Sequence, residues 1–159
     1  MLFTTLYEWY PVTPKYPPSD KVKFYIQNQR PEEYAQDPLD FYNPKRVEEY
    51  AESKSLMRTQ VKITERVLSL ANIPPPATIL DLGTGCGFAA KHLDYHGYQT
   101  VGLDINFLFL NYYYVPELNP IHADMRLFQF RPETFDLIIS ISAIQWILAE
   151  NDASLRKKY

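Results

Sequence analysis

The spacing of apolar residues changes at three consecutive prolines, residues 74–76. Before them, apolar positions recur at helical intervals and predict two helices, over residues 45–55 and 56–73. After them, short apolar runs predict four strands, over residues 79–82, 101–104, 121–125 and 135–142. Segments of helical character lie between strands, and such alternation is typical of an α/β fold with a parallel sheet.

Capping residues indicate where the later helices begin and end. The segment 88–96 is followed by Gly97, which suits the position just after a helix. Asn106 suits the start of a helix over residues 107–114, and a last helix is expected over 143–150. The run 135–142 is apolar on both faces, as expected of a buried strand.

The chain divides into three predicted parts. Residues 1–30 combine prolines with aromatic residues and predict an irregular extension, with one short strand at 21–27. Residues 31–73 predict an N-terminal helical cap, and residues 74–159 predict the core of alternating strands and helices.

The loop after the first strand is the most informative part of the sequence. It begins at an acid, Asp81, and has three glycines in alternate positions, Gly83, Gly85 and Gly87. The second strand ends in another acid, Asp104. Together these residues predict a nucleoside site at the carboxyl ends of the two strands.

The spacing of the glycines indicates which nucleoside. A dinucleotide fingerprint needs glycine where this chain has Phe88, so that a helix can approach a pyrophosphate. Asp81 would repel a pyrophosphate, whereas it suits the ammonium group of S-adenosylmethionine (SAM). Asp104 can accept hydrogen bonds from both ribose hydroxyls. The loop therefore favours SAM, and the alternative is a glycine turn in an unrelated α/β domain.

Composition limits the choice of function. With 159 residues, 46% of them hydrophobic, the chain is long enough for one domain with a core. Its single cysteine, Cys86, excludes a disulfide framework, and its place in the glycine loop indicates a packing role. The net charge of −3 gives no sign of nucleic acid, although a local patch or a partner can supply a basic surface.

Three kinds of feature are not expected. No apolar run reaches membrane-spanning length, and the N-terminus lacks the basic start of a signal peptide. His92 and His96 are spaced like a metal-binding pair, but no third ligand is near in the sequence. We expect those two histidines to lie on an exposed helix face, and we expect no metal site.

Four groups of residues carry a resemblance to a known family. They are Arg30-Pro31-Glu32 with Phe41-Tyr42-Asn43 and Tyr50; Gln60, Arg66 and Leu68; the glycine loop through Leu103-Asp104-Ile105; and Ser140-Ile141-Ser142-Ala143-Ile144-Gln145-Trp146. On these residues the chain resembles the class I SAM-dependent methyltransferases. Among them it is similar to the small-subunit ribosomal RNA (guanine-N7) methyltransferases, over about residues 30–157.

The resemblance implies a fold and an activity. The fold would be a partial class I methyltransferase (Rossmann-like) doubly wound sheet, preceded by N-terminal helices. The activity would be SAM-dependent methylation of guanine N7 in small-subunit ribosomal RNA, during ribosome biogenesis. A small-molecule SAM methyltransferase, or a non-catalytic SAM-binding fragment, remains an alternative. The implied location is cytoplasmic, or nuclear and nucleolar in a eukaryote.

The resemblance also implies partners. The strand at 121–125 would lie at an open sheet edge, beside the apolar and aromatic segment 107–115. There the family binds a small zinc-binding methyltransferase activator protein, although residues 1–29 could cover the same surface. The other partner would be ribosomal RNA or the pre-ribosomal small subunit. The class usually has seven strands and four are counted here. We therefore expect a truncated or split enzyme, whose missing strands come from a second polypeptide or were lost together with activity.

Site residues follow from the resemblance position by position. The cofactor would be held by Tyr42, Tyr50, Asp81, Gly83, Gly85, Gly87, Asp104, Ile105, Asp124, Met125 and Ile141. Ser142 and Gln145 would face the methyl group and the incoming base. Alternatives are that Tyr50 and Trp146 are core aromatics and that Asp124 caps a turn.

The chain departs from the family pattern in two places that matter. The family commonly has a basic residue near Ser55, and its absence leaves part of the contact to the cofactor carboxylate unassigned. Arg126 stands where the family has glycine, which changes the turn after Met125. Methylation of guanine N7 needs no general base, because N7 has a lone pair and no proton to lose. Catalysis then depends on the alignment of the reacting groups.

Overall fold

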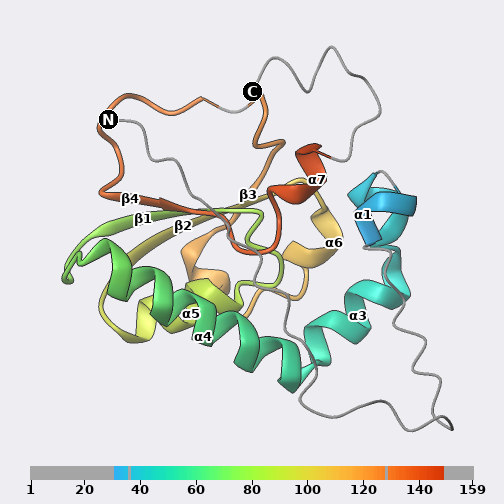
Figure 1. Cartoon of the computed structure of the whole chain (residues 1–159), viewed down its shortest axis with the longest axis horizontal. Coiled ribbons are helices and arrows are strands. Elements are labelled where there is room, and N and C mark those ends of the chain that lie inside the picture. Colours follow the sequence, from blue (N-terminus) through green and yellow to red (C-terminus); the bar gives the residue numbers. More distant parts are fainter. Residues whose placement is uncertain (1–30, 36, 128, 149–159) are drawn as a thin grey trace, which may run out of the picture.

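The computed structural model describes residues 31–35, 37–127 and 129–148 (Figure 1). A parallel sheet with the strand order β3-β2-β1-β4 forms its centre. The strands are β1 (Thr78–Leu82), β2 (Gln99–Asp104), β3 (Ile121–His122) and β4 (Leu137–Ile139). The predicted parallel α/β sheet is therefore confirmed. The strand proposed at 21–27 lies outside the described residues.

From Pro31 onward, the described part of the chain has four helices before the sheet: α1 (Pro31–Tyr34), α2 (Pro38–Phe41), α3 (Pro44–Glu52) and α4 (Lys54–Ala71). Ser53 separates the last two, and its side chain accepts a hydrogen bond from Leu56 N, so it caps α4. Asn72 ends α4 in the left-handed conformation. The two helices predicted from apolar spacing are thus confirmed, with boundaries set by these caps.

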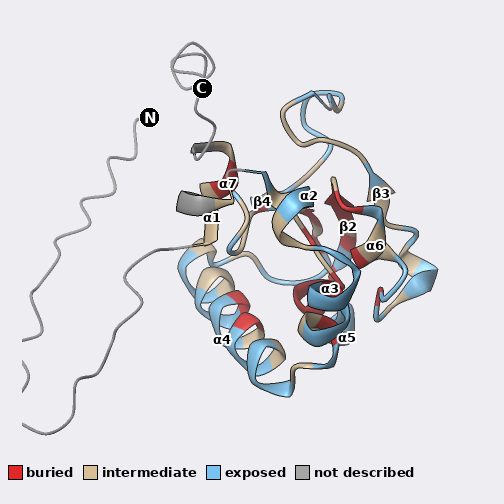
Figure 2. Ribbon diagram, turned by 90° about the vertical axis from the view of Figure 1, so that its right-hand side faces the viewer, coloured by how far each residue is buried: buried red, intermediate tan, exposed pale blue. Residues whose placement is uncertain are grey.

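Helix α5 (Phe88–Tyr95) connects β1 to β2 and lies with α4 on one face of the sheet (Figure 1). The core between them contains Ile79 and Ile139 from the sheet and Leu93 from α5, with Val67 and Leu68 of α4 packed against it. Figure 2 shows the buried residues gathered in the strands, in α5 and on a stripe of α4. Gly97 follows α5 with a φ of +82°, as predicted.

A second apolar cluster joins the N-terminal helices to the glycine loop. Val47 and Ala51 of α3 pack with Cys86, Phe88 and Phe109, all of them buried. Burial raises the pKa of the Cys86 thiol to about 12, so the thiol stays protonated. This supports the predicted packing role for Cys86.

Two elements are shorter than predicted, one beside a long-range hydrogen bond and the other beside a local turn. The helix expected over 107–114 is α6 (Phe107–Leu110), and the chain then turns so that the Tyr113 hydroxyl reaches the Thr84 side chain. The strand expected over 121–125 is only β3, because the Asp124 carboxylate accepts from Arg126 N and closes a turn. In both cases a side-chain contact competes successfully with the regular element.

The last strand differs most from its prediction. The run 135–142 was expected to be one strand buried on both faces, but β4 covers three residues and Ile138 is 58% exposed. In the described residues β4 pairs only with β1, so it lies at the edge of the sheet. Helix α7 (Gln145–Leu148) follows. None of the described helices combines the length and apolar composition that a membrane crossing requires.

Tyr113 explains why two glycines stand beside the site. A Cβ on Gly87 would lie 2.7 Å from the Tyr113 ring, and a Cβ on Gly102 would lie 2.3 Å from its hydroxyl oxygen. Tyr113 is 5% exposed. It therefore fills the space that these glycines leave between β2 and the glycine loop.

Candidate functional site

The glycine loop is held by hydrogen bonds to the end of β2. Leu103 O accepts from both Gly83 N (2.8 Å) and Thr84 N (3.0 Å), and the Asp104 carboxylate accepts from Gly85 N (2.8 Å). Gly87 N donates to Thr84 O. These N–H groups are committed inside the protein, so they do not form the cradle of free amides that binds phosphate. The structure thus agrees with the argument against a dinucleotide.

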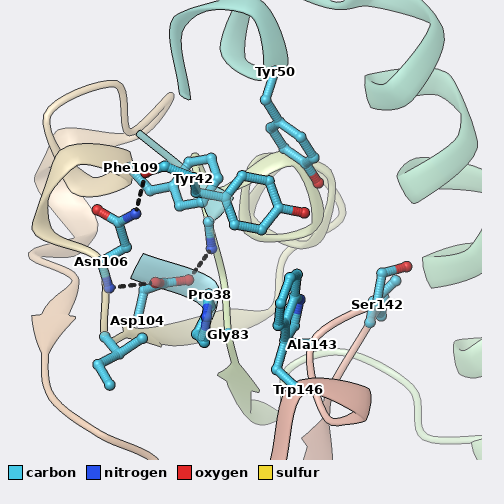
Figure 3. A pocket seen from close by; sticks show the side chains of 13 residues that line it. Pro38, Tyr42, Tyr50, Gly83, Asp104, Asn106, Phe109, Ser142, Ala143 and Trp146 are labelled. Atoms are coloured by element: carbon cyan, nitrogen blue, oxygen red, sulfur yellow. Dashed lines mark hydrogen bonds between the residues drawn. The ribbon is translucent and has the colours of Figure 1, made fainter. Parts of the chain in front are cut away.

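Asp104 is the best-positioned acid of the site. One of its carboxylate oxygens accepts from Gly85 N and the other from Asn106 N, each at 2.8 Å (Figure 3). Burial raises its pKa, and these backbone N–H groups act in the opposite direction. Each oxygen keeps a second lone pair, so the fixed carboxylate can accept two further hydrogen bonds from vicinal hydroxyls.

A pocket of about 550 Å³, partly open to solvent, lies above Asp104. It is lined by Pro38, Tyr42, Tyr50, Gly83, Gly85, Asp104, Ile105, Asn106, Phe109, Ile141, Ser142, Ala143 and Trp146. The Tyr42 ring lies 5.0 Å from that of Phe109 and 5.8 Å from that of Trp146, measured between centroids. This aromatic wall suits a planar, apolar group such as adenine.

A smaller chamber adjoins the main pocket and shares Tyr50, Gly83 and Ile141 with it. We call it the amino chamber. It is lined by Tyr50, Gln60, Asp81, Gly83, Thr84, Phe88, Ala89 and Ile141. The glycine loop therefore separates two acids, Asp104 in the main pocket and Asp81 in the amino chamber.

Asp81 is fully buried and has hydrogen bonds but no cation beside it among the described residues. The Thr84 hydroxyl donates to its carboxylate at 2.8 Å. Because that uses the only hydroxyl hydrogen of Thr84, the Tyr113 hydroxyl, 3.1 Å away, donates to Thr84. Burial raises the pKa of Asp81 to about 6, although the Thr84 hydrogen bond lowers it. A cationic group entering the amino chamber would stabilise the ionised carboxylate.

The structure brings most of the predicted site residues together. The main pocket contains Tyr42, Tyr50, Gly83, Gly85, Asp104, Ile105, Ile141 and Ser142. Asp81 lines the amino chamber. Tyr50 and Trp146 both line the main pocket and pack in its aromatic wall, so they serve as core and as lining together.

Four predicted residues lie outside both cavities. Gly87 lies under the Tyr113 ring, and Gln145 donates from its side chain to Ser142 O. Asp124 forms an ion pair with Arg126, which lowers its pKa, and Met125 lies close to Gly83. The Asp124 contacts are those of the turn cap considered as the alternative.

Sequence reasoning did not place three residues that the structure brings into the site. Asn106 was expected only as a helix cap, yet its side chain also donates to Tyr42 O and fixes that ring over the pocket. Gln60 and Phe109 line the cavities as well. The available signal for Gln60 was a polar residue on the buried side of an amphipathic helix, where it is 9% exposed.

Comparison with known proteins agrees with this geometry. The methyltransferase-domain family matches residues 80–158. The 18S rRNA (guanine-N(7))-methyltransferase bud23 of Schizosaccharomyces pombe is 37% identical over 125 residues, which are 75% of this chain and 46% of that protein. The 18S rRNA (guanine(1575)-N(7))-methyltransferase of Saccharomyces cerevisiae is 38% identical, over 74% of this chain and 44% of that protein.

Solved structures agree on the fold. A putative SAM-dependent methyltransferase from Methanococcus maripaludis superposes with a TM-score of 0.59 at 18% identity, over 73% of this chain and 56% of that one. Phosphoethanolamine N-methyltransferase 2 of Haemonchus contortus, in complex with SAM, gives 0.57 at 17% identity, over 82% of this chain and 32% of that one.

Fold, site and family match define the class of the core: residues 80–158 match a methyltransferase domain, and the sheet has the fold of the class I SAM-dependent methyltransferases. Within that class it is similar to the 18S rRNA (guanine-N(7))-methyltransferases, and the predicted resemblance is confirmed. The chain spans a little under half the length of these curated relatives.

The burial of the Asp81 carboxylate predicts how the free energy of unfolding depends on pH. Its pKa is about 6 in the folded chain against an ordinary 3.8, so between these values the folded chain holds a proton that the unfolded chain releases. Folding therefore becomes less favourable as pH rises through this window. We expect Asp81→Asn to raise the free energy of unfolding by roughly 2–3 kcal/mol at about pH 7.5 and by much less at about pH 4.

Urea unfolding at both pH values measures this difference. Asp94→Asn, at an exposed position on α5, is the matched control and should change little at either pH. An equal effect of Asp81→Asn at both pH values would contradict the buried, uncompensated charge.

Proposed function

We propose that this chain is the cofactor-binding part of a SAM-dependent methyltransferase that acts on guanine N7 of small-subunit ribosomal RNA. The observation that carries the proposal is the pair of buried acids, Asp81 and Asp104, on either side of the glycine loop. One faces a chamber that needs a cation, and the other offers paired acceptors to vicinal hydroxyls. SAM has a cationic amino end and a ribose at matching places.

The residues present fit the adenine, the ribose and the ammonium group of the cofactor. Asp104 would accept from the ribose hydroxyls, and the wall formed by Tyr42, Phe109 and Trp146 would enclose adenine. Asp81 would hold the ammonium group. The ring of Tyr50, which lines both the pocket and the amino chamber, lies 6.1 Å from that of Tyr42, and an aromatic ring at this place favours a sulfonium over a neutral sulfur.

The protein side chains need to supply little chemistry of their own. SAM, when bound, supplies an electrophilic methyl group, and guanine N7 attacks it with an existing lone pair. Tyr42, Tyr50 and Trp146 exclude water from the reacting atoms and hold the cofactor in one orientation. Ser142 lines the pocket at the carboxyl end of the sheet, where we propose that it faces the base, and Gln145 supports it from the following helix.

Guanine N7 as the target comes from the relatives, whose names specify 18S rRNA and that atom. Apart from Asp104, which we assign to the ribose, the described lining of the pocket has no carboxylate or histidine, and this is compatible with a nucleophile that has no proton to remove. Small-subunit RNA is made in the nucleus of a eukaryote, and we propose that the enzyme acts there.

We also propose that a small zinc-binding activator protein docks at β3. This strand is the outermost on its side of the described sheet, as predicted for the segment at 121–125. Phe107 is 56% exposed, and its ring lies 5.4 Å from that of His122 in this strand. An unpaired strand next to apolar side chains favours strand addition by another chain.

The edge at β4 is the second open edge of the described sheet, and we propose that it is paired in the active enzyme.

The first test concerns the cofactor. Asp104→Ala removes the acceptors for both ribose hydroxyls, and we expect SAM binding to weaken by roughly 2–4 kcal/mol. Isothermal titration calorimetry measures this, and circular dichroism shows whether the variant is folded. Asp94→Ala, at an exposed position on α5, should bind like the wild-type chain. Unchanged affinity in folded Asp104→Ala would rule out this site for the nucleoside.

The second test concerns the substrate. Tritiated SAM is incubated with the chain and either small ribosomal subunits or a small-molecule extract. We expect label in small-subunit RNA, at guanine N7, only when the activator and a polypeptide pairing with β4 are present. Label in small molecules alone would favour the other class of methyltransferase. Robust multiple turnover by the 159-residue chain with the activator alone would show that β4 needs no further strand.

The third test concerns the activator. Co-expression should keep the chain soluble, and the two proteins should co-purify. Phe107→Ser should reduce co-purification several-fold, because it removes an aromatic anchor at the edge. Tyr95→Ser is the control, since Tyr95 is 85% exposed but lies on α5. A stable, monodisperse chain that does not bind the activator would contradict the proposal.

A further inference from the structure

The amino chamber has an unusual balance of charge. Its lining contains one carboxylate, that of Asp81, and no lysine or arginine from the described residues. The nearby glycine-loop amides of Gly83, Thr84 and Gly85 already donate within the protein. An amino acid carries an ammonium and a carboxylate, and this chamber provides a counter-charge for the ammonium alone.

Gln60 offers an amide donor to a ligand carboxylate in the amino chamber, where the only other uncommitted polar group among the described lining residues is the neutral hydroxyl of Tyr50. It belongs to the buried stripe of α4, whose two buried residues, Gln60 and Thr64, are both polar (Figure 2). Its Nε2 donates to the Ser142 hydroxyl at 3.3 Å, across 82 residues of sequence. Its second N–H and its Oε1 have no other hydrogen bond within the described part of the chain.

A neutral amide offers both a donor and an acceptor. It can donate to a carboxylate or accept from an ammonium, so it discriminates only weakly between these two groups. A hydrogen bond from a neutral donor to a charged group is weaker than a buried charge pair, so Asp81 dominates recognition at this end. The ligand carboxylate also lies in the same chamber as the carboxylate of Asp81 and is repelled by it.

We propose that Gln60 is the specificity-determining residue for the amino-acid end of the cofactor, and that the chamber accepts the decarboxylated form of SAM. That compound keeps the sulfonium and the primary ammonium and lacks the carboxylate. The inference rests on the proposed SAM site and extends it to a second ligand. It is also compatible with the absence of the basic residue that the family commonly has near Ser55, since no lysine or arginine of the described residues lines the chamber.

The first measurement compares the two ligands on the wild-type chain by isothermal titration calorimetry. We expect SAM and decarboxylated SAM to bind with affinities within about tenfold of each other. A larger preference for SAM would show that a cation reads the carboxylate, and would overturn the inference.

The second measurement uses Gln60→Glu, which adds a carboxylate at almost constant volume. We expect it to weaken SAM binding by at least about tenfold and to change binding of decarboxylated SAM by less than about threefold. Gln99→Glu is the same substitution at an exposed position on β2 and should alter neither. Equal losses for the two ligands would show a purely structural role for Gln60.

Two further results keep the inference separate from the proposed function. If Gln60→Glu does not fold, Gln60→Met replaces it, and SAM binding should then fall more than that of decarboxylated SAM. Equal falls would again overturn the role of Gln60. Failure of the folded wild-type chain to bind either compound would overturn the SAM site itself and this inference with it, whereas SAM binding with the wrong ligand preference would overturn this inference alone.

Discussion

The hydrogen bonds that join the glycine loop to the end of β2 are the constraint on which the site depends. A single carbonyl, Leu103 O, accepts from two successive amides of the loop, and the next residue, Asp104, accepts from a third. The loop can follow this path because Gly83 and Gly85 adopt positive φ. Both acids are thereby held in place before any ligand binds, one on each side of the loop.

Two tyrosines that line the main pocket, Tyr42 and Tyr50, form what we call the roof of the site, and they are held in place differently. Tyr42 and Tyr50 come from the N-terminal helices, and they are tied to the sheet by few but specific contacts. Asn106 donates to Tyr42 O, and the Tyr114 hydroxyl donates to Ala51 O. Both donors belong to the short segment around α6, which carries Phe109 into the aromatic wall. The segment around α6 therefore positions the roof and contributes to the wall at the same time.

How much of this was predictable follows from the range of the interactions. The glycine loop, Asp81 and Asp104 were recognisable because the residues that shape them are close in sequence. Gln60 was missed as a site residue because its partner Ser142 is 82 positions away. The length of α6 was wrong for a related reason, since the Tyr113 hydroxyl contacts Thr84, 29 positions away. The length of β3 was wrong for a local reason: apolar periodicity does not record the turn that Asp124 closes with Arg126.

The two hydrogen bonds that hold the site also differ in the length of chain that each of them closes. The bond from Gly85 to Asp104 spans 19 residues, and it lies within a unit of two strands and one crossover helix that can form from nearby contacts. The bond from Gln60 to Ser142 closes a loop four times as long, with a larger entropic cost. The glycine loop and Asp104 can therefore be joined by contacts near in sequence, whereas both cavities close only with the turn after β4, which supplies Ile141 to each of them.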